Sequence, residues 1–322
     1  MCKSKKVCWC LYVRVVFTGL FLLPFNFSAY GAEALDLNTA LQNTYRACVN
    51  IDDDLHDLKV LAGVNTAVTA VGTGLGVGAV ATGFAKASTD KEIEELEKEL
   101  ERLSNEYDGP QPTQADRDAF LRECEEYEAS NTNNTAVEID ELTKKSKKLG
   151  NWRTGLLAGN TATNIAGAII SSKTIKNQGL QEQIDTCVSA TKALNDAIIA
   201  ARMNSEDIEE AKNIYEVCRE YEYVDISPIS NRGKGAMISS TIGAGLGGVG
   251  TITSAVVNSD KTRNDNTDEG RKKEKNLNTA SNVLAVGATA ASATATVFNA
   301  TQIAAVKKIA KVSEKCTGVL KW

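Results

Sequence analysis

Four uncharged runs rich in Gly, Ala, Val and Thr constrain this chain more than any other feature of its sequence. They cover Val60 to Ala85, Thr154 to Ser172, Gly235 to Ser259 and Asn276 to Val306. An interior glycine costs a helix in water about 1 kcal/mol relative to alanine. The runs therefore predict helices held by close backbone packing, either against each other or inside a bilayer that leaves no backbone group unsatisfied.

Glycines four residues apart give these runs a glycine-zipper pattern. In a helix such GxxxG pairs lie on one face and let a second backbone approach closely. The helix-packing positions that the pattern selects are Gly72, Gly74, Gly76, Gly78, Gly155, Gly159, Gly243 and Gly247. The same faces could also support self-association of the protein.

The order of the runs indicates a duplicated helical hairpin. The first and third runs share a Gly-x-Gly-Leu-Gly signature, at Gly72 and Gly243, and the second and fourth share an Asn-Thr-Ala-x-Asn signature, at Asn160 and Asn278. We expect an all-α protein of elongated helical hairpins or a bundle. The expected first hairpin covers residues 32–200 and carries a charged, coiled-coil-like insertion at 89–148, and the second covers 201–322.

The N-terminus has the features of a Sec-type signal peptide of bacterial type. Basic residues up to Arg14 precede a short apolar stretch, and Ala29 and Gly31 stand where a signal peptidase reads. Residues 1–31 are therefore interpreted as a signal peptide, with an uncleaved anchor as the alternative. Removing them changes the formal charge from −5 to about −9. The predicted location is the bacterial periplasm, the cell-envelope membrane or the extracellular space.

Polar segments separate the runs. Thr89 to Glu92 has the form of a capping box that opens a new charged helix, and Ser130 to Asn134 is predicted as a loop. The basic patch Lys144, Lys145, Lys147 and Lys148 is typical of a solvated helix face, with a lipid-binding motif as the alternative.

Five cysteines remain after the signal peptide, at Cys48, Cys124, Cys187, Cys218 and Cys316. In an exported protein they are disulfide candidates first. Cys218 and Cys316 lie about equally far from the tip of the second expected hairpin, which favours pairing at its base. The same argument pairs Cys48 with Cys187 and leaves Cys124 free. An echo between the sequences around Cys124 and Cys218 favours Cys124–Cys187 instead, and both alternatives stay open.

Chemical motifs in the sequence do not assemble into a catalytic set. Gly243 to Gly248 matches GxGxxG, but no apolar strand precedes it and no suitably placed acid follows. His56 is the one histidine, and its setting is that of a solvent-facing helical residue. The acidic balance argues against nucleic acid as a partner, and no metal, cofactor or small-molecule substrate is indicated. The sequence predicts a protein that is not an enzyme.

Two functional hypotheses remain. The run lengths suit the roughly 20 residues that cross a bilayer, and charge is missing around the whole helix circumference, so the favoured hypothesis is an exported protein that associates with membrane lipid through Gly-zipper helices. Asn160, Asn164 and many Thr and Ser residues favour the alternative, a soluble secreted or periplasmic bundle with a structural or protein-interaction role.

Overall fold

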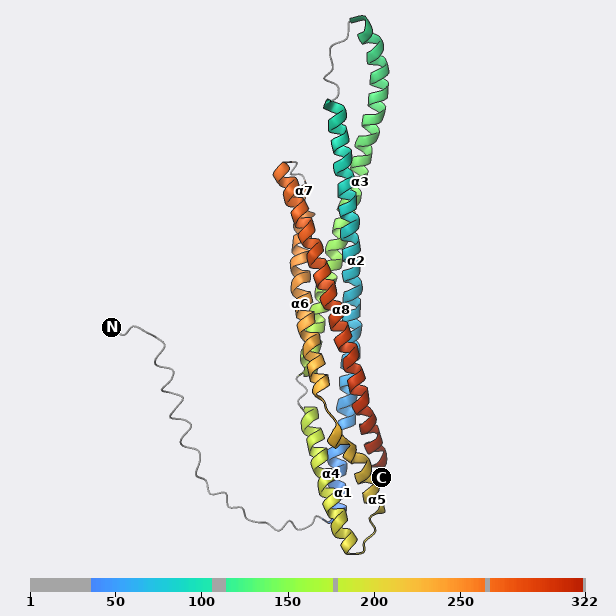
Figure 1. The fold of residues 1–322 in the computed structure, drawn as a ribbon, viewed down its shortest axis with the longest axis vertical. Helices are drawn as coiled ribbons and strands as arrows, with labels where there is room; N and C mark the ends of the chain where they lie inside the picture. Colours follow the sequence, from blue (N-terminus) through green and yellow to red (C-terminus); the bar gives the residue numbers. More distant parts are fainter. Residues whose placement is uncertain (1–35, 106–113, 176–178, 264–266, 321–322) are drawn as a thin grey trace, which may run out of the picture.

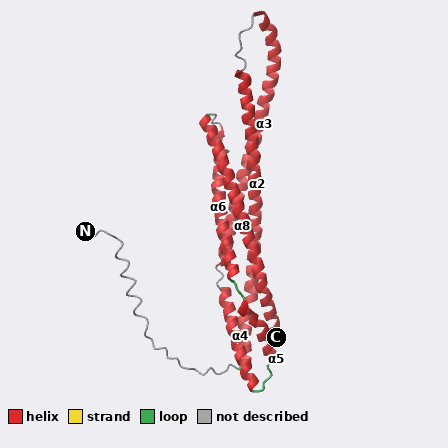
Figure 2. Ribbon diagram, in the orientation of Figure 1, coloured by secondary structure: helices red, strands yellow, loops and turns green. Residues whose placement is uncertain are grey.

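The computed structural model describes residues 36–105, 114–175, 179–263 and 267–320, so the predicted signal peptide lies outside it. The described residues are helical, without strands, which confirms the all-α prediction (Figure 2). The elements in chain order are α1 (Leu37–Cys48), α2 (Ile51–Asn105), α3 (Gln114–Ile175), α4 (Gly179–Met203), α5 (Glu209–Cys218), η1 (Arg219–Tyr223), α6 (Ser227–Val257), α7 (Asp260–Arg263) and α8 (Asp268–Val319).

Two long antiparallel hairpins, α2–α3 and α6–α8, pack side by side as an elongated four-helix bundle (Figure 1). Around the bundle the order is α2, α3, α6, α8, so each long helix contacts one partner of its own hairpin and one of the other. The α2–α3 hairpin extends past the α6–α8 hairpin at the end opposite α1, α4 and α5. We call residues 90–105 and 114–148 of that hairpin the arm.

The other end of the molecule is a compact base with an ordinary apolar core. Helices α1, α4, α5 and η1 pack there against the neighbouring ends of α2 and α8. Its buried side chains include Leu55, Ile184, Leu194, Ile214 and Tyr221. This base stands on one end of the four long helices.

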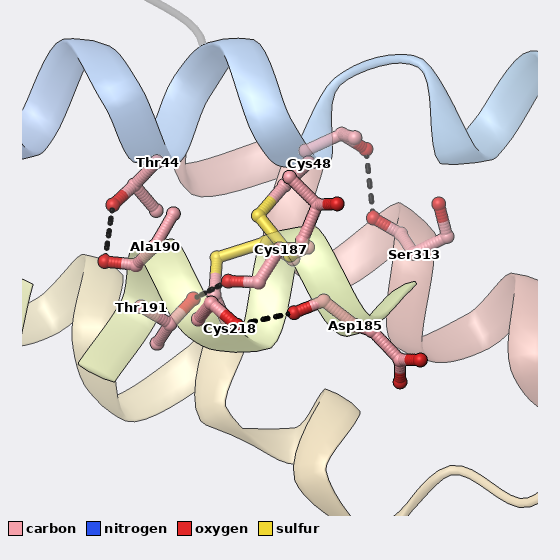
Figure 3. The surroundings of a disulfide bond; sticks show 12 residues. Thr44, Cys48, Asp185, Cys187, Ala190, Thr191, Cys218 and Ser313 are labelled. Atoms are coloured by element: carbon pink, nitrogen blue, oxygen red, sulfur yellow. Dashed lines mark hydrogen bonds between the residues drawn. A yellow bond between two sulfur atoms is a disulfide. The ribbon is translucent and has the colours of Figure 1, made fainter. Parts of the chain in front are cut away.

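Two disulfides close the hairpins within the base. Cys48 of α1 bonds to Cys187 of α4, and Cys218 of α5 bonds to Cys316 of α8 (Figure 3 shows Cys48, Cys187 and Cys218). The Sγ atoms of Cys48, Cys187 and Cys316 lie within 4.8 Å of one another, so the two disulfides are neighbours. Each bond joins the helix before a hairpin to the helix or helix end after it, and the side chain of Cys124 lies outside the described residues.

Two boundaries expected from the sequence are wrong. No new helix opens at the predicted capping box of Thr89 to Glu92, because α2 continues without interruption to Asn105. The Thr89 side chain is buried and its hydroxyl donates to the carbonyl of Ala85 instead of capping a new helix. Residues 130–134 are likewise helical within α3, since Ser, Asn and Thr cost a helix at most about 0.7 kcal/mol each.

We predict that each disulfide contributes strongly to stability, because each closes a long loop. The bonded cysteines are 139 and 98 residues apart, for which chain entropy gives about 4–5 kcal/mol. The double variant Cys48→Ser, Cys187→Ser should lower the free energy of unfolding in guanidinium chloride by about that amount. Cys124→Ser is the control, and an unchanged midpoint in the double variant would contradict the prediction.

Tyr221 gives the base a predicted sensitivity to high pH. The side chain is 1% exposed, and burial raises its pKa from 10 to about 12. Folding therefore favours the protonated phenol, and the stability present below pH 10 should fall by about 3 kcal/mol between pH 10 and 12. Tyr221→Phe should remove this loss, whereas Tyr223→Phe, at an 84% exposed position, should not. Unfolding free energies measured across that pH range provide the check.

Candidate membrane interface

The four long helices meet along a central seam with an unbroken heptad spacing. Buried residues alternate three and four positions apart on every helix, the pattern of a left-handed coiled coil. On α2 the series is Asn65, Thr69, Gly72, Gly76, Ala79, Gly83 and Lys86, and on α6 it is Gly233, Ala236, Ser240, Gly243, Gly247, Gly250 and Ser254. On α3 it is Gly150, Arg153, Leu157, Asn160, Asn164, Gly167 and Ser171, and on α8 it is Asn278, Ser281, Ala285, Ala288, Ser292, Ala295 and Asn299.

Seam glycines make room for oxygen atoms of facing side chains. A Cβ atom added at Gly72, Gly76 or Gly247 would lie within 3.0 Å of the hydroxyl oxygen of Thr163, Thr289 or Thr161, respectively. At Gly83, Gly150 and Gly243 it would meet the amide oxygen of an asparagine. Such contacts place a Cα–H group against an oxygen, a weak hydrogen bond that recurs at close helix interfaces.

The structure separates the eight glycines that the sequence selects into three groups. Gly72, Gly76, Gly243 and Gly247 lie in the seam. Gly78 and Gly159 are half-buried at its edge, where their Cα atoms face Leu156 and Leu75. Gly74 and Gly155 point outward, with no atom within 4 Å of an added Cβ.

Asparagine and serine side chains tie the two hairpins together inside the seam. Asn164 Nδ2 on α3 donates to Ser292 Oγ on α8 at 2.8 Å. Ser292 Oγ in turn donates to Asn160 Oδ1 at 2.9 Å. Nearer the base, Asn65 Nδ2 donates to Ser171 Oγ at 2.7 Å and to Asn299 Oδ1 at 2.9 Å. Because these side chains are buried, removing one partner would leave a costly unsatisfied group.

Charges enter the seam at its arm end. Lys86 is 1% exposed and pairs with Asp90 and, at 3.6 Å, with Glu274. Arg153 is equally buried, and its Nη1 donates to Asn278 Oδ1 at 2.7 Å. Asp90 also accepts a hydrogen bond from Ser146. These contacts link α2, α3 and α8 where the seam meets the arm.

The outer surface around the seam is apolar. Large exposed side chains on all four helices include Val64, Val71, Val77, Ile165, Ile169, Ile238, Ile242, Val249, Ile252, Val283 and Val297. Exposed threonines keep their hydroxyls bonded within the helix, as Thr241 does to Met237 and Thr294 to Ala290. The bundle is therefore polar inside and apolar outside, the reverse of an ordinary soluble bundle.

This apolar surface is as tall as a bilayer. Between Val60 and Ala85 on α2, and between Leu149 and Ser172 on α3, every exposed residue is uncharged. Uncharged runs of similar or greater length occupy the neighbouring parts of α6 and α8. At 1.5 Å per residue the shortest run measures about 36 Å, against roughly 30 Å for a hydrocarbon core. We call this uncharged surface the belt.

Among the described residues, three helical stretches are long and apolar enough to cross a membrane. They lie in Leu37–Arg102, Glu209–Val257 and Glu269–Val319, and only 28%, 33% and 28% of their most apolar windows are buried inside the protein. The second run, on α3, is not among them, in line with its asparagines and its weakness as an independent span. The protein is thus a helical bundle whose long apolar helices are compatible with membrane association.

The two sequence features considered as possible chemical sites, His56 and the motif from Gly243 to Gly248, both lie within long helices. His56 is exposed at the base end of α2. Gly243 to Gly248 lies inside the continuous helix α6, not in a strand-to-helix turn where a dinucleotide would bind. Comparisons with protein-family models, curated proteins and solved structures find no match for this chain.

The inverted polarity was missed by reasoning from the sequence alone, although a signal for it exists. Within each run, Gly, Ser and Asn recur at heptad positions while Val and Ile occupy the positions between them. A search for apolar stripes does not detect this pattern, because the residues that face the core are the more polar ones.

Matched alanine substitutions test the seam. Gly76→Ala and Gly247→Ala should destabilise the bundle by about 1–3 kcal/mol, because the new Cβ collides with a threonine of the facing helix. Gly74→Ala and Gly245→Ala, where an added Cβ meets open space, should be neutral or stabilise by up to about 1 kcal/mol. Thermal unfolding followed by circular dichroism measures both pairs. Equal effects at seam and outward positions would refute the assignment.

Proposed function

We propose that this protein is a non-enzymatic exported protein that inserts its four-helix bundle into a lipid bilayer. The observation that carries this proposal is the reversed polarity of the bundle, with Asn, Ser, Thr and Gly in the seam and Val, Ile and Ala on the belt. In water an exposed apolar surface of this size is a liability, whereas in lipid it is the required exterior.

Hydrogen bonding within the bundle supports the same assignment. A bilayer core offers no water to exposed polar groups, so they must be satisfied inside the protein. The threonines on the belt meet this demand through carbonyls of their own helices. Small seam residues that admit backbones to close contact, and interhelical Asn and Ser bonds, are common devices of membrane helix packing.

Aromatic side chains mark the arm end of the belt. Trp152 on α3 and Phe84 on α2 are each 61% exposed, close to the level at which Arg153 and Lys86 enter the seam. Trp is enriched where a membrane protein passes from hydrocarbon to headgroups. In this arrangement the base and the arm lie on opposite sides of the membrane, and the base disulfides favour an oxidising compartment for that side.

The alternative is a soluble exported bundle with a structural or interaction role. The extensive polar network of the seam, built around Asn65, Asn160 and Asn164, is the observation that favours it. Self-association would then cover the belt, and outward glycines such as Gly74 and Gly155 would admit a second copy.

Charge placed on the belt distinguishes the two functions. Val249→Glu with Ile252→Glu should abolish membrane retention after carbonate extraction, since a carboxylate costs about 2.5–3.5 kcal/mol at mid-membrane. Val137→Glu, a 60% exposed position on the arm, is the control and should leave retention unchanged. Release of the unmodified protein by carbonate would reject insertion and favour the soluble bundle.

A further inference from the structure

Two clusters of basic side chains, one on α3 and one on α8, lie directly beyond the arm end of the belt. We call the two clusters together the arm-side collar, which comprises Lys144, Lys145, Lys147 and Lys148 on α3 and Arg271, Lys272, Lys273 and Lys275 on α8. All of these residues are exposed. The sequence favours a solvated face for the α3 part, with a lipid-binding motif as the alternative, and the fold places it at the same level as the second cluster.

Hydrogen bonds fix the two clusters at the same height along the bundle. Ser146, in the middle of the α3 cluster, donates to Asp90. Asn278 of α8 donates to the same carboxylate at 3.2 Å, and Glu274, within the α8 cluster, pairs with Lys86 one turn before Asp90. Residues 144–148 and 271–275 therefore lie at the same level of the bundle, next to the belt.

Acidic side chains lie beside both clusters. Lys144 pairs with Asp140 and Arg271 with Glu97 at 3.6 Å, and Glu94 of α2 lies near Lys275 and Arg271. The excess of cations is therefore local to α3 and α8, where residues 144–148 carry four lysines and no acid and residues 271–275 carry four cations and one acid, in a chain whose overall formal charge is −5. Two basic clusters on an acidic protein, at the edge of a membrane-sized apolar belt, match an anionic lipid surface.

We propose that the arm-side collar binds the headgroups of anionic phospholipids, with the lysine ammonium groups on the lipid phosphates. The inference rests on the proposed insertion of the belt, because the belt brings the collar to headgroup level. Lysine stems can lie along the apolar surface while their charged ends reach the phosphates. Trp152, one turn from Lys148, provides an aromatic anchor at the same boundary.

Binding to vesicles of two compositions tests the collar. The full-length protein should bind vesicles of phosphatidylcholine with one quarter phosphatidylglycerol at least about tenfold more tightly than vesicles of phosphatidylcholine alone. The quadruple variant Lys145→Gln, Lys148→Gln, Lys272→Gln, Lys273→Gln should lose this preference and still bind the neutral vesicles. A control with the same charge change outside the collar, Lys192→Gln, Lys212→Gln, Lys308→Gln, Lys315→Gln, should keep it.

The outcomes separate the collar from the belt. Equal binding of the full-length protein to both vesicles, or a preference that survives in the collar variant, would overturn the lipid assignment while leaving insertion in place. A preference lost equally in the control variant would also overturn it, because net charge would then explain the effect. Failure to bind either vesicle would overturn insertion and the collar together.

Discussion

The rest of the structure depends on the close approach of the four long helices at the glycines of the seam. Where Gly72, Gly76 and Gly247 face threonine hydroxyls, the space that a methyl group would need is already occupied by oxygen. This spacing brings short Asn and Ser side chains within reach of partners on other helices, so hydrogen bonds such as Asn164–Ser292 and Ser292–Asn160 form between the hairpins. Larger seam residues would separate the helices and break these bonds, which is why the packing and the hydrogen bonding depend on each other.

Different interactions stabilise the base, the bundle and the arm. The base buries Leu, Ile and Tyr and adds two disulfides, as small exported domains do. The bundle in the middle buries little apolar surface and relies on contact between backbones. The arm, beyond Lys86 and Asp90, is a charged two-helix hairpin with surface ion pairs such as Lys98–Glu94, which contribute little stability each. An apolar core would be expected throughout if the whole molecule stood in water.

Several features could be predicted from the residues because simple geometry governs them. Helix type follows from the uncharged runs, and cysteines equidistant from a hairpin tip, such as Cys218 and Cys316, meet when the hairpin closes. Other features depend on how the helices are aligned along the bundle axis, which a local sequence pattern does not predict. The matching Asn signatures suggest that Asn160 and Asn278 are equivalent, yet Asn160 lies beside Ser292, 14 residues or about 21 Å further along α8. Thr89 fits a cap in the sequence, but in the structure it lies inside the continuous helix α2 and its hydroxyl donates to the carbonyl of Ala85.

Neither of the two disulfides among the described residues joins one hairpin to the other. Cys48–Cys187 lies wholly before the turn at Asn204 and Ser205, and Cys218–Cys316 lies wholly after it. This turn is exposed, and Ser205 has a positive φ of 61°. After a single peptide cleavage there, neither of these two disulfides would connect the two halves of the protein. Whether the two halves stay associated would then depend on the noncovalent contacts between the hairpins.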